Sequence, residues 1–448
     1  MAEEGKKYSR REFLKFAGIA GAAVGAAGGL GGILAACGSG TTTTTTAATT
    51  ATTAGATTTT AAGATTTAGA TTTAGATTTV SAAAATETLK VGAILSLTDW
   101  YSAVDAADKV DLEYVAKMIN DDGGIKVQGK GYAVELVIED GKSTLDGNTA
   151  AATKLVLDDK LQFVVGPGAF FNEATTPIFE QNKVLHVANY NGLNPAEMNK
   201  DTSYAFLGLD PITQQSATLK SLKQYYPDTK NVCLATEDAT YPGFQKGFAD
   251  LVARTGITLS GDPVLFSTSA EDYNPIASKI KAQNPSAVWM AIGIDPSFFG
   301  IVKGLRTLGY TGPIAFPVDV PSVVGALANA ATGIVGILSK QVEDPYIAAP
   351  MKALLEMGDT KRHVFGLAPN SLYMLRYAIE AANSLDPTAV RDKWSTMTSI
   401  PTLYGDGFPS GNKLYGLPNH AWAYPVPVCL INNAKAEYKP WILPDVTP

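Results

Sequence analysis

Residues 89–101 read Leu89-Lys-Val-Gly-Ala-Ile-Leu-Ser-Leu-Thr-Asp-Trp-Tyr101, an apolar run that changes abruptly into polar and aromatic residues. The part from Val91 to Leu97 carries no charge, which is typical of a strand buried on both faces of a sheet. From Asp108 onward apolar residues recur at helical spacing, and Gly123-Gly124 ends that pattern. Strand, loop and helix make half of a βαβ unit, and in sheets built from such units ligands bind at the carboxyl ends of the strands.

Strand and helix patterns keep alternating along the rest of the chain. The first series has expected strands over 132–139, 161–165 and 184–188 and expected helices over 150–158 and 173–181. The second has expected helices over 215–225, 244–254, 276–283 and 297–308 and expected strands over 231–236, 258–265, 287–292 and 314–316. Two more helices are expected over 370–384 and 387–394, and a strand-like run over 422–431. Such alternation predicts an α/β fold with mostly parallel sheets, and the series is too long for one sheet.

The composition of the chain is that of a globular protein with an acidic body. The chain has 448 residues, of which 46% are hydrophobic and 17% charged, and its formal net charge is −7. Residues 1–36 carry five basic and three acidic side chains, so the remainder has a net charge of −9. An acidic body argues against nucleic acid as a partner.

The N-terminus has the pattern of an export signal. Ser9-Arg-Arg-Glu-Phe-Leu-Lys15 precedes an Ala/Gly-rich apolar run over 16–36, and together they resemble a twin-arginine signal peptide. The run is too poor in large apolar residues for a permanent membrane span. Leu34-Ala-Ala-Cys37 resembles the lipobox of bacterial lipoproteins, which predicts lipidation of Cys37. The alternatives are a cytoplasmic amphipathic start and an unmodified thiol.

The segment after Cys37 is expected to be a tether. Residues 38–86 are nearly all Thr, Ala, Gly and Ser, and Ala-Gly-Ala-Thr-Thr-Thr repeats in register at 62–67, 68–73 and 74–79. A polar repeat this short builds no packed core. As a flexible coil, 37–86 spans roughly 35–42 Å on average, enough to hold a domain clear of a membrane surface.

The remaining cysteines and the familiar catalytic motifs give no sign of an enzyme. Cys233 and Cys429 lie in apolar runs, as buried inert thiols do, and a disulfide between them stays an alternative. The glycine-rich stretches at 124–130 and 166–168 lack, respectively, the Ser or Thr of a phosphate loop and the third glycine of a dinucleotide site. His186, His363 and His420 lack zinc-ligand spacing, and no Gly-x-Ser-x-Gly occurs. We therefore expect no catalytic residues, no metal and no cofactor.

A set of polar and aromatic residues follows the expected strands, where a ligand is expected to bind. For any one of them, packing under a loop is the alternative, and for the two aspartates the alternative is helix capping. The candidate ligand-binding residues are Trp100, Tyr101, Phe170, Phe171, Asn189, Asn191, Tyr241, Asp295 and Asp319.

In five places the chain resembles the type I periplasmic binding proteins of ABC importers, particularly the branched-chain amino acid (Leu/Ile/Val) receptor family. The places are Val91-Gly-Ala-Ile-Leu-Ser-Leu97 with its aromatic loop, Ile119-Asn-Asp-Asp-Gly-Gly-Ile125, Phe163-Val-Val-Gly166, Tyr241-Pro-Gly-Phe244 and Gly304-Leu-Arg-Thr-Leu-Gly309. The resemblance covers nearly everything from Leu89 onward.

The resemblance implies two Rossmann-like lobes joined by a three-segment hinge, with the ligand between them. The crossings are expected near Leu207–Pro211, Leu338–Glu343 and Leu403–Phe408. One lobe then comprises 87–208 with 342–404, and the other 209–340 with 408–448. Closure of the lobes on the ligand is the expected mechanism.

By the same resemblance, the chain is a substrate-binding lipoprotein of an ABC importer, monomeric and anchored outside the cytoplasm, with permease and ATPase partners. A ligand-sensing receptor for a membrane signalling partner is the alternative. In amino-acid receptors, hydroxyl residues and N–H groups of the first lobe hold the carboxylate, and an acid of the other lobe holds the ammonium. This chain has rings and amides in the corresponding loops, so an aromatic or amide-bearing ligand is a second alternative.

Overall fold

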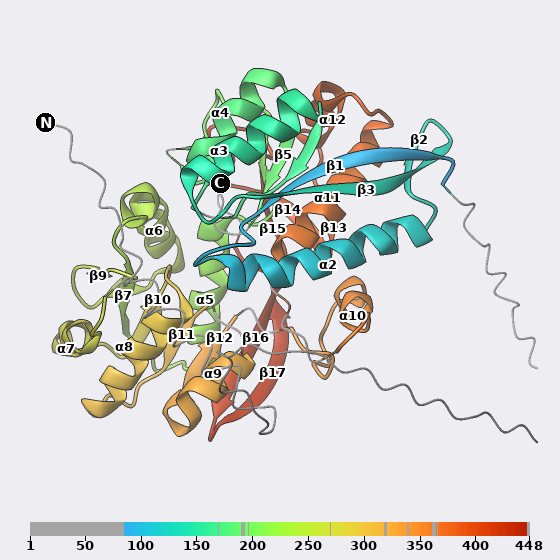
Figure 1. The fold of residues 1–448 in the computed structure, drawn as a ribbon. Coiled ribbons are helices and arrows are strands. Elements are labelled where there is room, and N and C mark those ends of the chain that lie inside the picture. Colours follow the sequence, from blue (N-terminus) through green and yellow to red (C-terminus); the bar gives the residue numbers. More distant parts are fainter. Residues whose placement is uncertain are drawn as a thin grey trace, which may run out of the picture. The chain divides into compact units, whose positions relative to one another are not determined.

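A computed structural model of the protein describes residues 85–168, 170–189, 193–195, 197–268, 270–317, 320–337, 340–360, 364 and 366–445. The predicted signal peptide (1–36), Cys37 and the predicted tether up to residue 84 lie outside these residues. The described residues form two α/β lobes, each built on its own sheet (Figure 1). The predicted fold class is confirmed.

The sheet of the first lobe is parallel through its centre. Among the described residues its nine strands lie in the order β13 (Ile400–Thr402), β14 (Gly405–Ser410), β15 (Ala421–Ala423), β6 (Ala205–Leu207), β5 (Leu185–Ala188), β4 (Phe163–Val165), β1 (Glu87–Leu95), β3 (Lys130–Asp140) and β2 (Ile125–Val127). Strand β1 runs parallel to both β3 and β4, with Gly92 opposite Val137 and Val164. The strands β1, β4 and β5 therefore end at one common edge.

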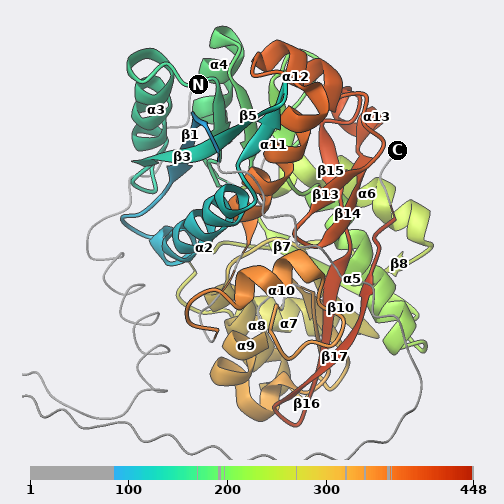
Figure 2. The ribbon, with the colours of Figure 1, turned by 90° about the vertical axis from the view of Figure 1, so that its right-hand side faces the viewer.

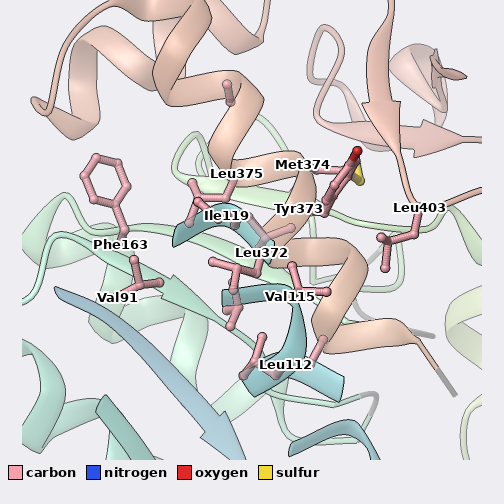
Figure 3. Packing of buried hydrophobic residues seen from close by; sticks show 14 of the residues in the cluster. Val91, Leu112, Val115, Ile119, Phe163, Leu372, Tyr373, Met374, Leu375 and Leu403 are labelled. Atoms are coloured by element: carbon pink, nitrogen blue, oxygen red, sulfur yellow. The ribbon is translucent and has the colours of Figure 1, made fainter. Parts of the chain in front are cut away.

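Alternate residues of β1 pack on opposite faces of this sheet, which explains its unbroken apolar run. Val91, Ala93 and Leu95 pack toward helices α2 (Ser102–Asp121) and α11 (Leu367–Ala382), as Figure 3 illustrates for Val91. Ile94 instead packs with residues of α3 (Leu145–Thr153), the π-helical turn Lys154–Asp158 and α4 (Asn172–Asn182). A strand covered by helices on both faces needs no polar side.

The second lobe repeats this construction. Among the described residues its main path is β17 (Lys435–Ile442), β16 (Val426–Asn432), β12 (Ile334–Gly336), β11 (Ile314–Phe316), β10 (Ala287–Met290), β7 (Asn231–Glu237) and β8 (Thr258–Leu259), and β9 (Val264–Phe266) also pairs with β7. One face packs on α7 (Asn274–Ala282), α8 (Asp295–Thr307) and α9 (Val320–Leu327). The other packs on α5 (Pro211–Tyr225) and α6 (Tyr241–Thr255).

Several short elements differ from the expected ones. The strand expected over 258–265 is split into β8 and β9, because Gly261 and Pro263 interrupt the pairing with β7. The strands β2, β6, β12, β13, β14 and β17, with the helices α9, α10 (Ala349–Leu355) and α13 (Asn412–Tyr415), have no counterpart among the expected elements. Most of these are too short to show a period of their own.

The third crossing between the lobes was placed wrongly. It was expected at Leu403–Phe408, but β14 and β15 both belong to the first sheet, through pairs such as Phe408 with Ala423. The chain enters the second sheet only at Val426, so the C-terminal residues contribute to both sheets (Figure 2). The boundary at 408 is wrong because β15 pairs in parallel with β6, far away in sequence, and no local pattern signals this pairing. Of the second crossing, Leu338 and Ser339 lie outside the described residues.

A buried carboxylate, Asp210, connects the first crossing segment to the C-terminal part of the first lobe. Asp210 begins α5, and its Oδ1 accepts hydrogen bonds from the Ile212 N–H (3.1 Å) and the Tyr415 hydroxyl (3.0 Å). Its Oδ2 accepts from the hydroxyls of Thr213 (2.5 Å) and Ser410 (2.7 Å). Helix α5 belongs to the second lobe, whereas Ser410 lies in β14 of the first sheet. This carboxylate therefore fixes the start of α5 to the first lobe.

Candidate functional site

Four of the predicted residues form an aromatic cluster at the carboxyl edge of the first sheet. Trp100 and Tyr101 follow β1, and Phe170 and Phe171 follow β4. All six pairs of these rings lie within contact range, with centroid separations of 5.3 Å (Trp100–Tyr101), 5.5 Å (Trp100–Phe170), 6.1 Å (Trp100–Phe171), 5.9 Å (Tyr101–Phe170), 5.8 Å (Tyr101–Phe171) and 6.5 Å (Phe170–Phe171). Edge-to-face and tilted arrangements of this kind are the favourable ones for aromatic pairs.

The loop after β3 holds this cluster in place. The Trp100 indole N–H donates to the Ser143 carbonyl (3.1 Å), and the Tyr101 N–H donates to the Ser143 hydroxyl (3.0 Å). The ring of Tyr101 lies against Gly168, where a Cβ atom would be only 2.8 Å from Cε1 of the ring. Tyr101 and Phe171 are 7% and 3% exposed, whereas Trp100 is 47% exposed. The cluster thus has two buried members and a face that is open at Trp100.

Asn189, at the end of β5, places a buried amide beside the same turn. Its N–H donates to the Pro167 carbonyl (3.3 Å), and the residue is 3% exposed. Within the described part of the chain, neither Nδ2 nor Oδ1 of its side chain has a hydrogen-bond partner. Gly166 has a φ of 89°, and a Cβ there would lie 2.4 Å from the Ile94 carbonyl oxygen and 3.5 Å from Asn189 Nδ2. Glycine therefore lets β1 and Asn189 approach each other across the end of β4.

Carboxyl groups with shifted pKa values lie at this edge. The Ser96 N–H donates to Asp105 (2.6 Å), and burial raises the pKa of Asp105 well above its ordinary value. Burial also acts to raise the pKa of Asp140, but the N–H groups of Lys142 and Leu97 and the Thr98 hydroxyl outweigh it, so that pKa is lowered. Burial, with the charge of Glu173 nearby, raises the pKa of Glu197 to about 7.

The second lobe contributes Tyr241 and Asp295 at the corresponding strand ends. Tyr241 is the first residue of α6, after β7; it is partly buried and stacks on Phe248 with centroids 6.4 Å apart. Asp295 is the first residue of α8, after β10, and the helix dipole stabilises a carboxylate at this position. Asn191 and Asp319 lie outside the described residues.

The two lobes approach each other beside these residues. A Cβ atom on Gly243, in the first turn of α6, would lie 2.7 Å from the Asn194 side chain, which belongs to the loop after β5. A larger residue at 243 requires the side chain of Asn194 to shift. Tyr241 therefore begins the helix whose first turn meets the loop that follows Asn189.

Comparisons with known proteins agree with this architecture. Residues 88–423 match the model of the periplasmic binding protein family. The chain belongs to this family. Its fold is similar to that of the leucine-binding protein LivK from Thermotoga maritima, with a TM-score of 0.62 and 20% identity over 80% of this chain and 99% of that one.

Two further solved structures carry ligands of different chemistry. LivJ from Streptococcus pneumoniae, in complex with isoleucine, is similar to this periplasmic binding protein with a TM-score of 0.61 and 21% identity, over 80% of this chain and 100% of that one. A solute-binding protein from R. palustris, in complex with benzoate, has a TM-score of 0.62 and 15% identity, over 81% and 98%. At such identities the likeness establishes the fold and leaves the ligand of this periplasmic binding protein open.

Sequence reasoning missed two further buried polar groups of this periplasmic binding protein. Within the described residues, the hydroxyls of Ser96 and Thr236 have no hydrogen-bond partner. Ser96 directly follows β1, and Thr236 is the next-to-last residue of β7. Their position at strand ends was the available signal, but a single Ser or Thr there is too common to be singled out.

Other features of the described residues lie away from this edge. A surface hollow of about 240 Å³ is lined by Asn284, Tyr310 and neighbouring residues, which precede β10 and β11 and so lie at the opposite ends of those strands. Cys233 and Cys429 are buried free thiols, and burial raises the pKa of each to about 12. The described residues contain no cluster of three or more potential metal ligands and no helix long and apolar enough to cross a membrane.

Proposed function

We propose that this chain is the substrate-binding lipoprotein of an ABC importer. It captures an amino acid or a related small organic solute between its lobes and delivers the solute to a membrane permease driven by an ATPase. The observation that supports this most directly is the match of residues 88–423 to the periplasmic binding protein family. The gathering of Trp100, Tyr101, Phe170 and Phe171 at one sheet edge supports the position of the site.

Capture requires both lobes. A micromolar dissociation constant corresponds to about 8 kcal/mol, and one ring contact contributes only about 1 kcal/mol. Contacts from the first-lobe cluster and from Tyr241 or Asp295 must therefore act together. A solute that makes all its contacts only in the closed form shifts the population toward that form.

Replacement of Tyr241 by alanine is expected to weaken solute binding about tenfold without unfolding the protein. The ring is partly buried and begins α6, so its loss removes roughly 1.4 kcal/mol of contact with a solute held at the strand ends. Isothermal titration calorimetry with the tightest solute from a panel of amino acids and aromatic acids and amides measures the effect. Tyr346→Ala, at an exposed tyrosine, is the control. Equal affinity in Tyr241→Ala and the control would remove Tyr241 from the site.

Replacement of Cys37 by alanine is expected to release the protein from the membrane. Without the thiol no lipid can be attached, and the chain found by fractionation shifts from the membrane to the soluble extracytoplasmic fraction. Cys233→Ala, at a buried thiol, is the matched control and keeps the wild-type distribution. Membrane retention of Cys37→Ala would show that the anchor does not depend on this residue.

A further inference from the structure

The buried amide of Asn189 and the aromatic cluster flank one short turn. The backbone of Asn189 is bonded to Pro167, and Nδ2 of its side chain lies beside Gly166. Two residues further along, the ring of Tyr101 packs against Gly168. One small molecule seated at this turn therefore meets a ring surface on one side and an amide on the other.

We propose that the solute is a planar aromatic compound whose polar end is uncharged and offers a hydrogen-bond donor next to an acceptor, as a carboxamide does. Its ring lies against Trp100 and Phe170, and its polar end pairs with the side chain of Asn189. This proposal rests on the proposed function and narrows the class of its ligand.

The ring surface favours an aromatic solute over an aliphatic one. Tyr101 and Phe171 are buried and support the outer members, Trp100 and Phe170, which keep exposed surface. An aromatic ring adds edge-to-face or stacked contacts of about 0.5–1.5 kcal/mol each beyond the area that it buries. A branched aliphatic side chain buries comparable area but forms no such contacts.

The side chain of Asn189 favours an amide over a carboxylate. An asparagine amide presents two donors at Nδ2 and an acceptor at Oδ1, and burial of such groups without partners costs about 1–3 kcal/mol. A carboxamide supplies the complementary acceptor and donor, so both atoms are paired. A carboxylate accepts a hydrogen bond from Nδ2 but has no donor for Oδ1, so Oδ1 stays unpaired next to a negative charge.

The ionised carboxylate of Asp140 at this edge also disfavours an anionic solute, since its pKa is lowered. Three more carboxyl groups lie at or beside the edge, Asp105, Glu173 and Glu197, and the raised pKa values of Asp105 and Glu197 reduce their share of the negative charge. Among the described residues, none of the four forms an ion pair with a lysine or arginine. The N-termini of α2 and α4 are attractive for anions, but each has an acid in its first turn, Asp105 or Glu173.

The test compares three probes on the full chain by isothermal titration calorimetry. Benzamide and benzoate share ring and size and differ in the amide against the carboxylate, and L-leucine represents the aliphatic amino acids. We expect benzamide to bind at least tenfold more tightly than either of the others. Tighter binding of benzoate or of L-leucine would overturn the proposed ligand class and leave solute binding intact.

Two variants tie the preference to these residues. Asn189→Asp removes the donor and adds a charge, so benzamide binding is expected to fall at least tenfold, while the matched Asn182→Asp, at an exposed asparagine of α4, leaves it unchanged. Phe170→Leu, at a partly exposed ring, is expected to weaken benzamide about tenfold and tests the proposal even where Asn189→Asp does not fold. Unchanged benzamide affinity in a folded Asn189→Asp or in Phe170→Leu would overturn the proposal. If no member of a panel of amino acids and aromatic acids and amides raises the melting temperature, the proposed function itself fails.

Discussion

Replacement of Asp210 by alanine is expected to lower the free energy of unfolding by about 3–5 kcal/mol. The change removes the acceptor that the buried hydroxyls of Thr213, Ser410 and Tyr415 share, and loss of a partner by a buried polar group costs about 1–3 kcal/mol. Thr213 and Ser410 still bond each other, so the cost is less than that of three unpaired groups. It also removes the N-cap of α5, which adds about 1 kcal/mol. Urea unfolding followed by far-UV circular dichroism measures the difference.

The control for Asp210 is an aspartate with no buried partner. Asp201 is exposed, and among the described residues its side chain pairs with the neighbouring Lys200 alone, so Asp201→Ala is expected to change stability by less than about 0.5 kcal/mol. Asp210→Asn keeps the size of the side chain and one acceptor oxygen, and it should fall between the two. If Asp210→Ala were as stable as Asp201→Ala, the carboxylate would not be what fixes α5 to the first lobe.

The sequence predicts best where side-chain periodicity and burial coincide. The uncharged run Val91–Leu95 indicates a doubly covered strand because helices on both faces exclude polar residues from it. Trp100 and Phe171 were expected near each other for a related reason, since parallel strands bring their carboxyl ends to one edge. Both inferences need only local pattern and the geometry of parallel sheets.

The sequence does not predict features that depend on contacts between distant segments. The Trp100 indole N–H and the Tyr101 backbone N–H both donate hydrogen bonds to Ser143, which is more than 40 residues away in the sequence. Likewise, β15 joins the first sheet by pairing with β6, and no periodicity in residues 421–423 predicts this pairing. The absence of a partner for the Asn189 amide within the described residues is also a property of its surroundings, so the identity of the residue alone gave no sign of it.

His186→Leu is expected to stabilise the protein at pH 7 and to reduce its sensitivity to acid. His186 is fully buried in β5 and packs on Phe179, with ring centroids 4.7 Å apart. Neither ring nitrogen has a hydrogen-bond partner among the described residues. Leucine is of similar size and carries no polar atom to bury, so a gain of about 1–2 kcal/mol is expected in urea unfolding at pH 7.

The acid dependence arises because burial disfavours the protonated, positively charged form of His186. Burial lowers the pKa of His186 to about 3 from an ordinary value of 6.5. Between these values the unfolded chain binds the proton and the folded chain does not, so stability falls as the pH falls from 6.5 toward 3. At about 1.4 kcal/mol per pH unit, His186 costs the wild type roughly 3 kcal/mol between pH 7 and pH 4.

Four buried or partly buried carboxyl groups act in the opposite direction and must be separated from His186. Burial raises the pKa of Asp105 well above its ordinary value, that of Asp108 to about 6 and those of Glu180 and Glu197 to about 7. Their contribution to stability is complete below pH 4 and is lost as the pH rises through 6–7. They are present in both proteins, so the difference between wild type and His186→Leu, measured from pH 7 to pH 4, isolates the histidine.

His420 provides the matched control, because it is buried in the same lobe but has partners. Its Nδ1 lies 2.7 Å from the Pro418 carbonyl oxygen and its Nε2 lies 2.9 Å from that of Ser203. His420→Leu removes the ring N–H that one of these carbonyl groups accepts and is expected to destabilise the protein by about 1–3 kcal/mol at pH 7. A His186→Leu protein that loses stability at pH 7, or that keeps the wild-type change between pH 7 and pH 4, would contradict a neutral and unpartnered imidazole in β5.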